Sequence, residues 1–224
     1  MSGCDAFSDS DIFKMINYFK TKKYSNRNIS LVVFGCFTGL RLSEILSLKR
    51  RDIINFDKTI KHKVYVKHTK TKVMRTVYLN ETLREYLKQW LSEQYKTGRR
   101  GSFNYIFTSR TNHYTYTKKH KKKNKDKFRR KCGLSVQRVI QIIQEAAYFC
   151  NIEGHIGSHS MRKTAARISY EYAQQNKIDA WTFTKNVLGH KSVKETEYYL
   201  SFICADFEKQ KQHAFENFEK RIFA

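Results

Sequence analysis

Apolar residues recur along most of this chain at intervals of three and four positions, the spacing of one face of an α-helix. The pattern predicts a helix after the polar run Ser8–Asp11, another over 29–37 that stops near Gly39, and a short one around Ile45. Further helices are expected after Asn80, over 134–150, over 160–174, over 179–188, and after Ser192, which forms a capping-box sequence with Glu195. The chain is therefore expected to be mainly α-helical.

One stretch alternates between apolar and polar residues instead. Val64–Val66 and residues 73–79 flank a polar turn at 68–72, which predicts an antiparallel hairpin. Residues 53–60 are expected to add a third strand. No linker or repeat divides the sequence, so we expect a single α+β domain over 1–224, mainly helical, with a small antiparallel sheet of about three strands.

Composition supports a domain with its own core. The chain has 224 residues, of which 40% are hydrophobic. No apolar run approaches the ~20 residues of a membrane span, and the start of the chain lacks a signal-peptide pattern. The five cysteines are scattered and lack the close pairs of a zinc site, so they predict free thiols in a reducing compartment and no bound metal or other cofactor.

The charge balance points to a polyanionic partner. Lys and Arg number 44 against 20 Asp and Glu, for a formal net charge of +24. Double-stranded DNA is the simplest partner for such a chain, and a membrane surface is not expected. Residues 118–131 are either a solvated loop or a strap that contacts phosphates, and we expect DNA contacts there. Its cations are Lys118, Lys119, Lys121, Lys122, Lys123, Lys125, Lys127, Arg129, Arg130 and Lys131.

Five residues in a fixed order suit the attack of a tyrosine on a phosphodiester. Arg41 lies in the run 38–44, His159 and Arg162 are three positions apart, and Tyr199 follows His190 by nine. Guanidinium forks neutralise nonbridging phosphate oxygens, and imidazoles bind phosphate or move protons near neutral pH. A tyrosine is a poor nucleophile at its ordinary pKa of ~10, so a cationic pocket must help it ionise.

This ordered set resembles the catalytic domain of the tyrosine recombinases, the phage-integrase family, over about residues 8–200. The resemblance implies that Arg41 is the first phosphate-binding arginine and that Glu44 is its supporting acid. It also implies that Lys70, in the turn between the two strands, protonates the leaving 5′ oxygen. Lys72 is the alternative, because the turn is short and the alignment there is loose.

The remaining boxes match in the same order. Residues 159–162 resemble the second box, and Lys163 stands where many family members have histidine. His190 resembles the histidine or tryptophan of the Leu-Gly-His box. Tyr199 lies at the usual spacing from His190, which makes it the expected nucleophile. Tyr198, on another side of the same predicted helix, is expected to be a packing residue.

The resemblance implies an enzyme that cleaves and rejoins DNA through a 3′-phosphotyrosyl intermediate, without metal or ATP. Such a site-specific recombinase or integrase would be a monomer when free and a homo-tetramer on paired DNA sites, and would integrate or excise a mobile element. It would act in the cytoplasm or nucleoid of a prokaryotic host, or in the host nucleus if the element is a eukaryotic virus. The alternatives are a type IB topoisomerase-like relaxer and a catalytically inactive basic DNA-binding protein.

Two features differ from the usual family pattern. The first box begins too early for a separate N-terminal core-binding domain within this sequence. We expect a single-domain recombinase, and the alternative is an upstream domain that lies outside this sequence. Residues 118–131 look like a basic insertion. The tail at 205–224 is amphipathic and is expected to dock in trans on a neighbouring protomer, with packing in cis as the alternative.

Overall fold

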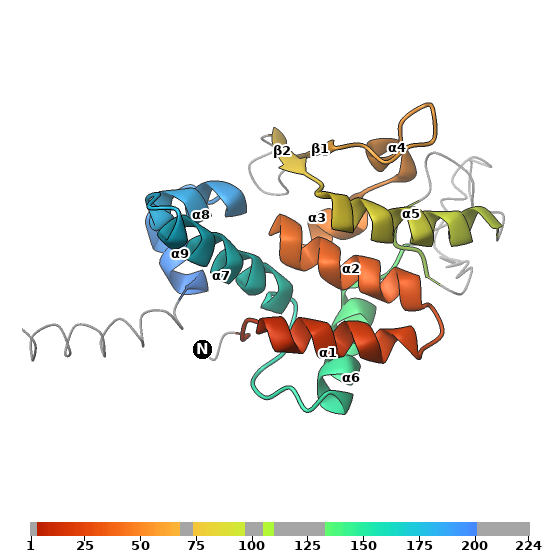
Figure 1. Ribbon diagram of the computed structural model, residues 1–224, viewed down its shortest axis with the longest axis horizontal. Helices are drawn as coiled ribbons and strands as arrows, with labels where there is room; N and C mark the ends of the chain where they lie inside the picture. Colours follow the sequence, from red (N-terminus) through yellow and green to blue (C-terminus); the bar gives the residue numbers. More distant parts are fainter. Residues whose placement is uncertain (1–3, 68–73, 97–104, 110–132, 201–224) are drawn as a thin grey trace, which may run out of the picture.

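The computed structural model describes residues 4–67, 74–96, 105–109 and 133–200, and most of these residues are helical (Figure 1). This confirms the predicted fold class. In chain order the elements are α1 Asp9–Lys20, α2 Ser25–Thr38, α3 Leu42–Ser47, α4 Arg50–Ile53, β1 Lys63–Lys67, β2 Met74–Tyr78, α5 Glu81–Lys96, α6 Val136–Phe149, α7 Ser160–Gln175, α8 Ala180–Leu188 and α9 Val193–Tyr199.

Side-chain caps begin several helices where the sequence predicted. Ser8 and Asp11 form a reciprocal capping box at the start of α1. The Asn80 side chain accepts a hydrogen bond from the Leu83 amide at the start of α5. At α9 the predicted box is only half formed, because Ser192 accepts from the Glu195 amide. The Glu195 carboxylate accepts from the Lys191 amide instead.

The sheet has two strands in the described part of the chain, not three. β1 and β2 pair antiparallel, with Lys63 opposite Tyr78 and Val66 opposite Arg75. The expected third strand reduces to an isolated bridge between Ile54 and Ile60. The reason is a tight turn between these two residues, which includes Lys58 at a positive φ of 68°. This turn folds the segment back on itself before it can lie along β1.

α2 is the central helix of the larger core. It is buried on nearly all sides, as expected of a helix surrounded by other elements, and residues 29–36 are mostly apolar. It packs against α1, α5 and α7, and Gly35 permits the close approach of α7, because a Cβ there would lie 2.6 Å from the Met161 sulfur. No helix among the described residues is long and apolar enough to cross a membrane.

α7, α8 and α9 form a second, smaller cluster beside this core (Figure 1). Leu188 and Leu200 are fully buried within it. The two clusters meet where the C-terminus of α2 lies against the end of α8. A Cβ on Gly39 would come within 3.0 Å of the Leu188 side chain. Residues of the boxes named above flank this junction, since Arg162 donates to the carbonyls of Gly39 and Leu188.

Candidate active site

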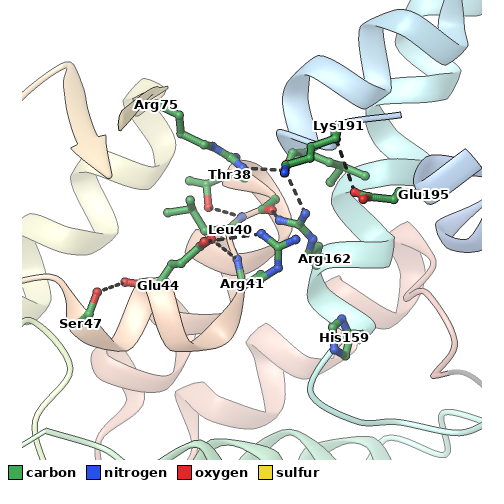
Figure 2. A network of polar contacts seen from close by, with 12 residues as sticks. Thr38, Leu40, Arg41, Glu44, Ser47, Arg75, His159, Arg162, Lys191 and Glu195 are labelled. Carbon is green, nitrogen blue, oxygen red and sulfur yellow. Dashed lines mark hydrogen bonds and ion pairs between the residues drawn. The ribbon is translucent and has the colours of Figure 1, made fainter. Parts of the chain in front are cut away.

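Arg41 is placed by the end of α2 and the start of α3. Gly39 ends α2 in the left-handed conformation, with φ of 59°, and Arg41 is the N-cap of α3. The buried Glu44 carboxylate accepts from the Arg41 amide at 2.9 Å and lies 3.5 Å from its guanidinium. Figure 2 shows the pair side by side. One carboxylate thus fixes both the backbone and the side chain of Arg41, consistent with the supporting role expected of Glu44.

Arg162 lies in the first turn of α7 and is only 2% exposed. Its guanidinium donates to the carbonyl of Gly39 and, at 2.9 Å, to the carbonyl of Leu188. Burial lowers the pKa of Arg162, Tyr199 raises it, and Arg41 lowers it further. An arginine stays protonated through such changes. The Nε atom is buried without a partner among the described residues, and a bound anion would satisfy it.

Tyr199 is the last residue of α9, and its phenol lies beside His159. The phenol oxygen is 2.8 Å from Nδ1 of His159. The Arg162 guanidinium carbon is 5.3 Å from the centre of the tyrosine ring, and the His190 ring centre is 4.9 Å from it. Three of the predicted site residues therefore surround the predicted nucleophile.

The surroundings of His159 favour the neutral form of its imidazole. Partial desolvation lowers its pKa below 6.5, and the charges of Arg162, Arg41 and Lys163 lower it further. A neutral imidazole can accept a hydrogen bond at Nδ1 when its proton is on Nε2. The phenol of Tyr199 then donates to that atom. The geometry and the charge state together suit transfer of the phenol proton to His159.

His190 is buried, at 7% exposure, just after the glycine that ends α8. Its Nδ1 is 2.9 Å from the hydroxyl of Thr196, which is fully buried on α9. This contact fixes the ring against the helix that carries Tyr199. Lys163, the following residue of the second box, is also buried, at 6% exposure.

Sequence reasoning missed two residues of this cluster. Thr196 orients His190, and Arg75 on β2 donates to three backbone carbonyls at the ends of α2 and α8. Figure 2 shows Arg75 pointing toward Arg41 and Arg162. The only signal in the sequence is position, because Thr196 lies six residues after His190 and Arg75 closely follows the predicted lysine turn.

Several predicted residues lie outside the described part of the chain. They are Lys70, Lys72, the cations of 118–131 and the tail at 205–224. The side chain of Tyr198 is likewise outside the description. Among the described residues, no group of three or more histidine, cysteine or acidic side chains could hold a metal ion.

Known proteins resemble this chain in sequence and in fold. The sequence profile of the phage integrase family matches residues 6–202. YoeC of Bacillus subtilis (strain 168), a probable integrase/recombinase, is 26% identical over 176 residues, which are 79% of this chain and 78% of YoeC.

Two solved structures share the fold. XerA recombinase aligns with a TM-score of 0.64 and 20% identity over 93% of this chain and 64% of its own. XerH site-specific recombinase, bound to its palindromic difH substrate, aligns with a TM-score of 0.64 and 18% identity over 92% of this chain and 52% of its own. This chain therefore spans less than two thirds of either solved protein chain, and at these identities the likeness establishes the fold.

Proposed function

The chain belongs to the phage integrase family, and on this premise we propose that it is a site-specific DNA recombinase that works through a 3′-phosphotyrosyl intermediate. The observation that carries the proposal is the 2.8 Å contact between the Tyr199 phenol and His159, beside the guanidinium of Arg162. A nucleophile, a proton acceptor and a buried cation meet at one point. A passive DNA-binding protein needs the charge but not the other two.

In the proposed step, the Tyr199 oxygen attacks the scissile phosphorus and its proton passes to Nδ1 of His159. The bond from phosphorus to the 5′ oxygen breaks, and Lys70 gives that oxygen a proton, with Lys72 as the alternative. Arg41 and Arg162 neutralise the charge that develops on the nonbridging oxygens, which is the main electrostatic demand of such a reaction.

A second 5′ hydroxyl then attacks the phosphotyrosyl bond, the strand is rejoined, and Tyr199 regains its proton. The phosphotyrosyl bond conserves the energy of the phosphodiester, so the cycle consumes no ATP. The arginines supply the positive charge that metal ions supply in other phosphoryl-transfer enzymes, and the cycle requires no metal. His190, held by Thr196, would bind a phosphate oxygen.

We also propose how the protein acts on its substrate. The partner is double-stranded DNA, supported by the net charge of +24. Cations of 118–131 contact phosphates, and a homo-tetramer forms on paired sites while the free protein is a monomer. In this arrangement the tail at 205–224 docks in trans. The biological setting is integration or excision of a mobile element, at the DNA of a prokaryotic host.

The test is trapping of a covalent adduct on a nicked suicide duplex that carries the target site. Tyr199→Phe should abolish the adduct and leave DNA affinity within about twofold, because the substitution removes only the nucleophilic oxygen. Tyr198→Phe is the matched control and should cleave normally. A dead Tyr198→Phe beside an active Tyr199→Phe would reassign the nucleophile.

The wild-type reaction, run in EDTA, separates the remaining alternatives. A metal-independent adduct followed by strand exchange between two duplexes supports a recombinase. An adduct that only relaxes supercoiled DNA would instead identify a type IB topoisomerase-like enzyme. Binding with no adduct would identify a DNA-binding protein without catalysis.

A further inference from the structure

Arg75 makes an unusual set of contacts for a strand residue. One terminal nitrogen, Nη1, donates to the carbonyl of Leu188 at 2.7 Å. The other, Nη2, donates to the carbonyls of Val187 at 2.8 Å and Thr38 at 3.1 Å. These acceptors are the last carbonyls of α8 and α2, where the helix leaves its carbonyls without partners and the dipole favours a cation. A single guanidinium thus joins the ends of two helices to β2.

Arg162 binds the same two helix ends from the other side. It donates to Gly39, next to the Thr38 carbonyl that Arg75 uses, and to Leu188, the carbonyl that both arginines share. The Leu188 carbonyl therefore accepts one hydrogen bond from each guanidinium, at 2.7 Å from Arg75 and 2.9 Å from Arg162. Movement of Arg75 would release two of the carbonyls that define this junction and leave Arg162 to hold it alone.

The cluster places like charges close together. Burial, followed by the nearby charge of Arg162, lowers the pKa of Arg75 to about 10. Arg162 is buried and Arg75 is partly buried, and their like charges repel each other, so an arrangement that served stability alone would not favour a second cation here. The carbonyls of two helix ends offset part of that repulsion.

The local backbone is also shaped around Arg75. Gly189 adopts a φ of 67°, and a Cβ on it would lie 2.9 Å from Nη1 of Arg75. The glycine of the Leu-Gly-His box is therefore needed both for the turn and for the space that the guanidinium occupies. His190 follows this glycine directly, and Arg41 lies two residues after Gly39.

We propose that Arg75 is a positioning residue, which holds the ends of α2 and α8 so that Arg41, Arg162 and His190 face one phosphate. The proposal rests on the proposed function, because it assigns Arg75 a part in that cleavage reaction. Arg75 itself touches backbone carbonyls and not the reacting atoms. Its loss should slow cleavage by misplacing the phosphate-binding groups.

The experiment compares variants in single-turnover cleavage of the suicide duplex at saturating protein. Arg75→Met should cut the cleavage rate on the order of 10²-fold, the effect of a misplacement of about 1 Å in a positioned site. DNA affinity should stay within about twofold, since phosphate contacts elsewhere supply most of the binding. Arg75→Lys keeps the charge but not the fork, so it should remain slow. Arg84→Met is the matched control, because Arg84 is paired with Glu81 on α5, and it should cleave normally.

A double-mutant cycle with Arg162→Lys separates positioning from general damage to the fold. Because Arg75 is proposed to position Arg162 together with Arg41 and His190, the double variant should lose clearly less than the product of the two single losses. Fully multiplicative losses, or a wild-type rate in Arg75→Met, would overturn the positioning role. If Arg75→Met does not fold, the same comparison with Arg75→Lys decides. Absence of any adduct with the wild-type protein would overturn the proposed function itself.

Discussion

Replacing His159 by glutamine would separate two tasks of this side chain, accepting the proton of Tyr199 and holding its phenol. Nδ1 lies 2.8 Å from the phenol oxygen, within the reach required of a general base. A general base typically contributes about 10²–10⁴-fold in rate, which is roughly 3–5 kcal/mol of the barrier. His159→Ala should lose this whole factor. His159→Gln keeps a hydrogen-bond acceptor for the phenol but cannot take up its proton. This variant should therefore lose most of the same rate factor.

The pH profile gives the sharper readout. Desolvation and the charges of Arg162, Arg41 and Lys163 put the pKa of His159 below 6.5, so the imidazole is neutral at pH 7. The wild-type cleavage rate should therefore be flat above pH 6.5 and fall at lower pH, as His159 becomes protonated. In His159→Gln that acid limb should disappear, and the rate should rise toward the ordinary phenol pKa of ~10.

The same pKa affects folding with a definite sign. The unfolded chain protonates His159 near pH 6.5, whereas the folded chain resists protonation to lower pH. The unfolded state then binds more protons in that window, so stability is lost as the pH falls below 6.5. Stability measured by urea unfolding at each pH, compared between wild type and His159→Gln, separates this loss from the chemical step.

The cleavage assay measures single-turnover adduct formation on the suicide duplex, from pH 5 to 9, with protein in excess so that binding does not limit the rate. Rates within threefold of wild type for His159→Gln would refute the general-base assignment. An acid limb that persists unchanged in that variant would show that another group titrates. Either result would leave Tyr199 as the nucleophile and move its proton to a different acceptor.

Two further predictions follow from the geometry and the charge. Gly189→Ala should lower the free energy of unfolding by about 1–2 kcal/mol, because alanine is strained at a φ of 67°. The midpoint of thermal unfolding should fall by roughly 2–8 °C. An unchanged midpoint would contradict this backbone strain. Replacing 118–131 by an uncharged segment of equal length should flatten the log–log dependence of DNA affinity on salt by several units, because ten phosphate-seeking cations are lost; an unchanged slope would make that segment a solvated loop.

Local features of this fold could be predicted from the sequence because their causes are local. Ser8 and Asn80 begin α1 and α5 because a side-chain oxygen next to an apolar run satisfies an open amide of the first turn. The hairpin of β1 and β2 follows from alternation on both sides of one polar turn. The third strand failed because a short apolar stretch at 53–60 does not reveal that its own turn folds it back.

The candidate site likewise contains some residues that the sequence reveals and others that it does not. Arg41, His159, Arg162, His190 and Tyr199 could be found because each is a reactive side chain at a fixed place in an ordered set of boxes, and four of the five lie in contact or in one hydrogen-bonded cluster. Boxes that are far apart in the sequence thus bring their reactive side chains together in the fold. These are the side chains that would contact the substrate in the proposed reaction.

Arg75 could not be found, and the reason is physical. Its partners are the carbonyls of Thr38, Val187 and Leu188, and every residue type carries such a carbonyl. No pattern of side chains can mark them, and they lie up to 113 positions away in the chain. A search for sequence motifs therefore cannot find this proposed positioning residue. It binds backbone at the ends of two helices, and only the packed fold brings those ends together.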